Sequence, residues 1–80
     1  MRRVDLVVER FPQCADEVRR LYLRDADFRA ICEDLALCLD SLHHFEARPD
    51  APLRPEVDDF RNLVTELEAE LSRHIAAAAG

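Results

Sequence analysis

Apolar residues recur every three or four positions from Phe11 to Phe45, and this spacing constrains the fold more than any other feature of the chain. Steps of three and four place side chains on one face of an α-helix. The residues of the series are Phe11, Cys14, Val18, Leu21, Phe28, Cys32, Leu35, Leu39 and Leu42. The spacing therefore predicts a long amphipathic helix over about residues 13–46.

Asp25 is the only polar residue that interrupts this apolar stripe, and it leaves two interpretations open. In a continuous helix, Asp25 is a polar residue tolerated for register, and it lies four positions before Arg29, with which it can pair. Alternatively, Asp25 is the N-cap of a fresh helix, because Asp accepts hydrogen bonds from free N–H groups at a helix start. We take the continuous helix as the prediction and the break as its alternative.

Proline residues divide the rest of the chain into segments. Residues 3–10 are expected to form a short helical segment, and Pro12 forces Phe11 out of helical dihedrals, so that Phe11-Pro12 is a corner. Three more prolines make residues 47–54 a linker, and the last of them, Pro55, suits the first position of a second helix over about 55–77.

The second helix has an apolar stripe of its own, and the two stripes fit each other. If the chain folds back at residue 51, positions whose numbers sum to about 102 meet, so that Leu39 faces Leu63 and Phe28 reaches His74. Short loops join antiparallel helices. We therefore predict one all-α domain over 1–80, an antiparallel helical hairpin with knobs-into-holes packing of the coiled-coil kind.

The first predicted helix is longer than the second, which ends opposite about residue 25. An uncovered apolar stripe of this length indicates an interface, and the alternative for part of it is that the N-terminal segment with Leu6, Val7 and Val8 folds back onto it. We expect a homodimer with two-fold symmetry that forms a bundle, and a heterologous helical partner is the rival. The predicted interface residues are Phe11, Cys14, Val18, Leu21, Tyr22 and Phe28.

Charge and hydropathy exclude several classes of function. The net charge is −6, the chain has no Lys, and its Arg residues are interspersed with acids, so we expect no nucleic-acid partner. No apolar run approaches the roughly 20 residues of a membrane span, and we see no signal-like segment. The three Cys residues are an odd number, which argues against a disulfide framework. We therefore expect a cytoplasmic protein with reduced cysteines and no membrane partner.

We find no residue pattern for catalysis, a cofactor or a metal ion. The single Gly is the last residue, so no Gly-rich phosphate loop is present, and two thin helices offer no enzyme-sized pocket. Cys14, Cys32 and Cys38 are interpreted as small apolar residues, and neither a C-x-x-C nor an H-x-x-x-H motif occurs. We predict a non-enzymatic interaction module, an adaptor or regulatory protein. The alternative is a metal- or redox-responsive protein that uses Cys and His across the dimer.

The chain also resembles a known family. The Phe11-Pro12 corner, the Asp25-x-x-Phe28 step and the acidic pair Glu33-Asp34 resemble the pattern of the YdcH-like small bacterial proteins, whose function is not established. The resemblance covers about residues 6–76 and departs from the family pattern at Leu35, where a Tyr is expected. It implies a helical hairpin and a bacterial cytosolic origin, and it carries no catalytic residue.

Overall fold

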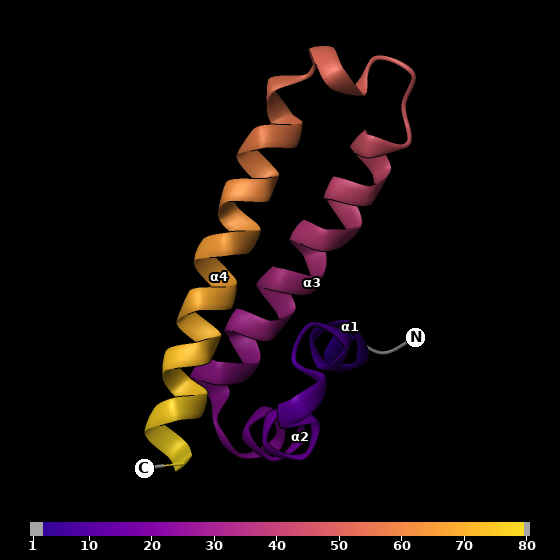
Figure 1. Cartoon of the computed structure of the whole chain (residues 1–80). Helices are drawn as coiled ribbons and strands as arrows, with labels where there is room; N and C mark the ends of the chain where they lie inside the picture. Colours follow the sequence, from indigo (N-terminus) through magenta and orange to yellow (C-terminus); the bar gives the residue numbers. More distant parts are fainter. Residues whose placement is uncertain (1–2, 80) are drawn as a thin grey trace.

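The chain folds into helices joined by short turns, as described for residues 3–79 by a computed structural model (Figure 1). The α-helices are α1 (Arg3–Arg10), α2 (Ala15–Arg24), α3 (Ala26–Glu46) and α4 (Pro55–Ala79), and two 3₁₀ turns are η1 (Pro12–Cys14) and η2 (Ala51–Leu53). No strand occurs within residues 3–79. The predicted all-α class is therefore confirmed.

The two longest helices, α3 and α4, lie side by side and run in opposite directions (Figure 1). At the loop end, the rings of Phe45 and Phe60 stack with their centroids 5.6 Å apart. At the other end, the ring of Phe28 meets that of His74 edge-on at 6.0 Å, the contact that the fold-back pairing predicts. The fully or nearly buried residues of this helix pair also include Cys32, Leu35, Ala36, Cys38, Leu39, Leu42, Val57, Val64 and Leu71.

The two short helices α1 and α2 form a second layer. Both are seen end-on in Figure 1, α1 beside the first half of α3 and α2 below its start, so they cross the α3–α4 pair rather than extend it. Val7 of α1 and Val18 of α2 are fully buried and belong to the same apolar cluster as α3 and α4. An ion pair of 2.7 Å between Arg10 and Glu68 also connects the end of α1 to α4.

The predicted continuous helix over 13–46 is wrong at Asp25, where the structure has the break of the alternative interpretation. Asp25 is extended, with φ −115° and ψ 110°, and its Oδ1 accepts hydrogen bonds from the N–H groups of Asp27 at 2.9 Å and Phe28 at 3.1 Å. The carboxylate thereby satisfies two of the free donors at the start of α3. The chain turns at this residue, and α2 folds back beside α3.

This turn also overturns the expectation that residues 11–28 are left uncovered. Val18 and Phe28 have no exposed surface, because α1 and α2 fold onto the first half of α3 and bury the stripe within one chain. The length mismatch between the predicted helices is therefore removed by folding back.

The proline signals place the other turns. Phe11 has φ −130° and ψ 59°, and Pro12 opens the turn η1, so the predicted corner is present. α4 begins at Pro55, as predicted, and ends at Ala79, two residues beyond the predicted end. Pro restricts its own φ angle and lacks a backbone donor, so these boundaries follow from local chemistry alone.

Candidate functional site

The six residues predicted to form the interface all belong to the apolar core of the chain or pack against it. Val18 and Phe28 are fully buried. The other four are half-buried and packed against the core, and they are Phe11, Cys14, Leu21 and Tyr22. The structure thus brings all six into the packing of one chain, and self-association stays a prediction.

Polar bonds hold Tyr22 against α3. Its hydroxyl donates to Oε1 of Glu33 at 3.4 Å, and its carbonyl oxygen accepts from the guanidinium of Arg29 at 3.1 Å. Arg29, which the continuous-helix interpretation pairs with Asp25, therefore fastens the end of α2 to α3. These bonds make Tyr22 a residue that fixes the turn between the two helices.

The three cysteines are free thiols in apolar surroundings. Cys32 and Cys38 are buried and Cys14 is half-buried. Burial raises the pKa of Cys32 to about 12, and the negative charge of Glu33 acts in the same direction. Burial, with a smaller contribution from Asp34, also raises the pKa of Cys38. Since the thiolate is the nucleophile and the metal ligand, these two protonated thiols are poorly suited to either role.

The histidines do not converge. His43 and His44 are exposed near the end of α3, and His74 lies against Phe28 near the end of α4. Within residues 3–79 no group of three or more His, Cys, Asp or Glu side chains lies close enough together to hold a metal ion.

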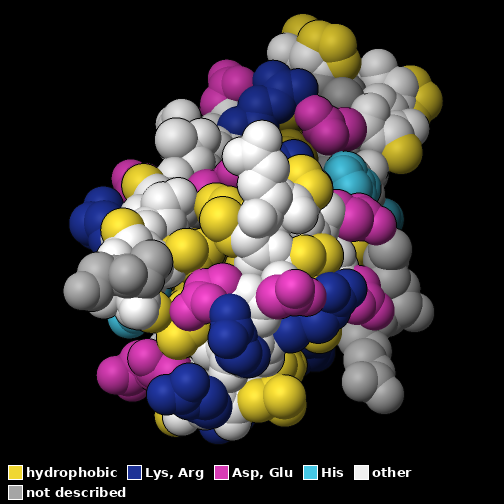
Figure 2. Space-filling view, turned by 60° about the horizontal axis from the view of Figure 1, so that its bottom comes forward, with side chains coloured by type: hydrophobic (Ala, Val, Ile, Leu, Met, Phe, Trp, Pro, Cys, Tyr) yellow, Lys and Arg dark blue, Asp and Glu magenta, His cyan; other side chains and the backbone are white. Residues whose placement is uncertain are grey.

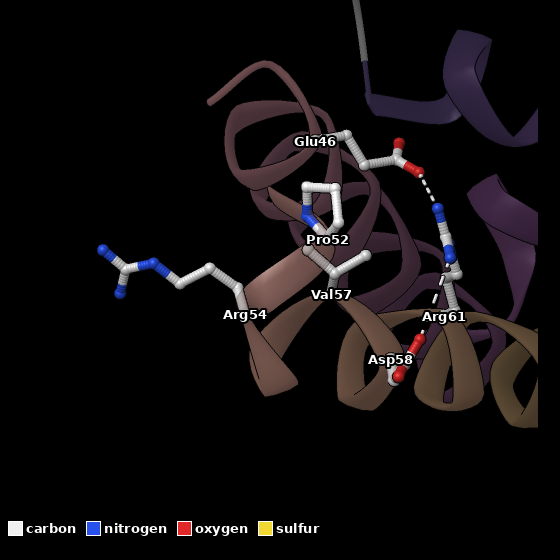
Figure 3. Close-up of a pocket in the computed structure, with 6 residues that line it drawn as sticks. All are labelled: Glu46, Pro52, Arg54, Val57, Asp58 and Arg61. Atoms are coloured by element: carbon white, nitrogen blue, oxygen red, sulfur yellow. Dashed lines mark hydrogen bonds and ion pairs between the residues drawn. The ribbon is translucent and has the colours of Figure 1, made fainter. Parts of the chain in front are cut away.

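The arginines that line a pocket at the loop end are paired with carboxylates (Figure 3). The guanidinium of Arg61 lies between Glu46, at 2.7 Å, and Asp58, at 3.8 Å, so two carboxylates already neutralise it. Arg54 lines the same pocket, but its side chain points away from the other residues drawn and pairs with Asp50 at 2.8 Å. The Arg61–Glu46 ion pair connects α4 to the end of α3. Among the described residues that line the pocket, both arginines are paired, so neither is free to bind an anion there.

Arg54 also sets the protonation of Asp50 in the loop. Its hydrogen bond, together with that of Arg48, lowers the pKa of Asp50 below its ordinary value. Arginine–carboxylate ion pairs thus connect residues of the loop at its surface. Exposed pairs of this kind contribute little to stability, and we assign them a structural role.

A different surface lies between α3 and α4 on the side away from α1 and α2. It is a shallow groove of about 270 Å³, and all its lining residues come from α3 and α4: Asp34, Leu37, Cys38, Leu63 and Leu67. We call this surface the open face. Leu37 is 50% exposed and Leu63 is 40% exposed, so large apolar side chains stand in solvent on both walls of one groove.

The border of the open face is acidic. Positions three or four residues from a lining residue lie one helical turn away from it. None of these positions holds an Arg, and five exposed acids line the groove or lie one turn from it: Asp34, Asp40, Asp59, Glu66 and Glu70. None of the five has an ion-pair partner within the described residues 3–79. The open face therefore combines an apolar centre with an uncompensated negative rim.

One residue of this face, Leu37, is recognisable in the sequence because it lies outside the apolar stripe of α3. Leu37 lies two positions after Leu35, so it is out of phase with the buried stripe and points to another side of α3. A large apolar residue in such a position is a candidate contact residue, because the intrachain core does not explain it.

Comparison with protein-family models, curated proteins and solved structures finds no match for this chain. The resemblance to the YdcH-like proteins therefore stays a prediction. Within residues 3–79, every helix is too short or too polar to traverse a bilayer.

Proposed function

We propose that this chain is a non-enzymatic helical interaction module that self-associates, and that the open face is the surface on which it docks a helix. The observation that carries the proposal is the pair Leu37 and Leu63, which remain about half exposed on opposite walls of one groove. The opposite side of the same helix pair is covered by α1 and α2.

The physical support is the incomplete burial of a two-helix surface. A groove between two helices accepts the apolar side of a third by ridges-into-grooves packing, which is a common mode of peptide recognition. Full burial of a leucine side chain contributes roughly 1.5–3 kcal/mol of stabilisation. Covering the exposed surface of Leu37 and of Leu63 therefore contributes part of that amount for each residue to the stability of the complex. Cys38 and Leu67 supply the apolar remainder of the groove.

This proposal keeps the predicted self-association and moves its surface. The predicted interface residues, Val18 and Phe28 above all, are occupied by packing within the chain, whereas the open face is not. In the proposal, α3 and α4 are the antiparallel hairpin of a helical bundle, as the YdcH-like resemblance implies. We also keep as a proposal that the protein works in the bacterial cytoplasm.

The test is sedimentation equilibrium of the wild type, Leu37→Asp and Leu63→Asp at micromolar concentration. We expect the wild type to exceed the monomer mass and both variants to approach it, because a buried carboxylate in the groove opposes docking. Asn62→Asp is the matched control: Asn62 is exposed next to Leu63 in sequence but outside the groove, and its variant should associate like the wild type. A monomeric wild type would refute the proposal.

A further inference from the structure

The outer side of α2 has the opposite character to the open face. Leu23 is 77% exposed, and it is surrounded within one helical turn by Arg19, Arg20 and Arg24, which are all exposed. Arg20 pairs with Glu17, whereas Arg19 and Arg24 have no ion-pair partner within residues 3–79. Figure 2, which brings the α2 end of the molecule forward, shows Arg side chains gathered there with acidic and hydrophobic ones among them.

The charge asymmetry extends to the two parts of the sequence. Residues 1–24 contain six Arg and four acids, for a net charge of +2. Residues 25–80 contain five Arg and thirteen acids, for a net charge of −8. The segment that contains α1 and α2 and the segment that contains α3 and α4 therefore attract each other between molecules as well as within one.

We propose that the helix docked on the open face is α2 of a second copy of this chain, with Leu23 entering the groove between Leu37 and Leu63. This inference rests on the proposed function and names its partner. A single exposed leucine suits a groove whose lining spans only residues 34–38 and 63–67, which is little more than one helical turn on each side. Arg19 and Arg24 then lie close to the unpaired acids of the rim.

The same charges disfavour the symmetric arrangement, in which two open faces meet. That arrangement brings the rim acids of one copy against those of the other, and like charges that face each other across an interface weaken binding. A contact between α2 of one copy and the open face of the next joins two different surfaces. A copy that is bound through only one of these surfaces has the other left for a further copy.

The test mixes two variants, each of which has lost a different surface. Leu23→Asp removes the α2 surface and Leu37→Asp the open face, and both positions are exposed enough for the fold to survive, which far-UV circular dichroism checks. We expect each variant alone to be monomeric by sedimentation velocity, with an apparent dissociation constant at least about ten-fold weaker than that of the wild type. We expect the mixture to form a one-to-one dimer, since one intact surface of each kind remains.

The outcomes separate the two proposals. If Leu23→Asp associates like the wild type while Leu37→Asp is monomeric, the docked helix is not α2; this inference fails and the proposed function stands. If the mixture stays monomeric, the inference also fails. If the wild type itself is monomeric, both proposals fail.

Asn62→Asp serves again as the control. Raising the salt concentration is expected to weaken the wild-type association, because screening weakens the Arg–acid attraction. A salt-independent association would contradict the part assigned to the arginines.

Discussion

The two sides of the α3–α4 pair differ in how far the chain completes them. On the covered side, Val7 and Val18 are fully buried against the pair, and the Arg10–Glu68 ion pair connects the two layers. On the open face, Leu37 and Leu63 are about half exposed and the surrounding acids lack ion-pair partners among residues 3–79. The chain thus supplies its own cover for one side and leaves large apolar residues exposed on the other.

The difference between the two sides indicates which apolar residues are candidates for contact with another molecule. Leu35, in phase with the stripe, is fully buried, whereas Leu37 and Leu23, which are out of phase with their neighbours, are exposed. Leu35 therefore belongs to the core, whereas Leu37 and Leu23 mark surfaces that the core does not use.

The largest expected effect compares one truncation on each side. Phe28→Ala should lower the free energy of unfolding by about 3–5 kcal/mol, because Phe28 is fully buried and its removal leaves a cavity. Leu37→Ala should lower it by less than about 1 kcal/mol, since half of the side chain is already in water. Urea unfolding of both variants in dilute solution measures the difference, and equal losses would show that the two sides are packed alike.

A second comparison uses the pH dependence of stability. The thiol of Cys32 has a pKa of about 12 in the folded chain against an ordinary value of 9.0, so between these values the unfolded state loses a proton that the folded state keeps. The contribution to stability is therefore fully present below pH 9 and is lost as the pH rises to about 12, by up to about 1.4 kcal/mol per pH unit.

Cys32→Ala should reduce this alkaline loss. The measurement is the free energy of unfolding at pH 8 to 11 for the wild type and the variant, because the difference between them removes the titration of other groups. If the free energies of unfolding of the wild type and the variant change in parallel with pH, the thiol of Cys32 is not desolvated, and α1 and α2 do not bury it.

A smaller effect is expected at the residue that separates α2 from α3. Asp25→Ala removes the two hydrogen bonds to the N–H groups of Asp27 and Phe28 and should lower the free energy of unfolding by about 1 kcal/mol. Asp27→Ala is the control, since Asp27 is exposed and its side chain does not cap α3; its effect should stay within about 0.5 kcal/mol. If Asp25→Ala is neutral, the cap does not stabilise the turn that brings α2 back onto α3.

Much of the fold follows from local sequence chemistry, and the rest depends on packing. Pro12 and Pro55 mark their turns because of their own ring geometry, and the spacing of apolar residues gives the helices. Asp25 is ambiguous, because the same carboxylate suits both an N-cap and a pair with Arg29. Burial of Val7 and Val18 against α3 decides for the break, and this is a tertiary effect that periodicity within one helix does not contain.

The candidate site differs from the predicted interface. The sequence predicts association through the apolar stripe of residues 11–28, but that stripe packs within the chain, and the proposed contact uses Leu23 on the outer side of the same segment. Leu63 belongs to the predicted stripe of the second helix, but its exposure depends on α1 and α2 covering the other side of the pair. Which side is covered is a property of the arrangement of all four helices, and the sequence pattern of each helix leaves it undetermined.

The most direct test of the two-sided account is the free energy of unfolding of Ala36→Asp and Leu37→Asp. These residues are neighbours on α3 with the same new side chain, yet Ala36 has no exposed surface and Leu37 is 50% exposed. The account predicts that Ala36→Asp unfolds the protein or costs more than about 3 kcal/mol, because the carboxylate is buried without a partner, while Leu37→Asp costs less than about 1 kcal/mol. Similar losses for the two variants would contradict it.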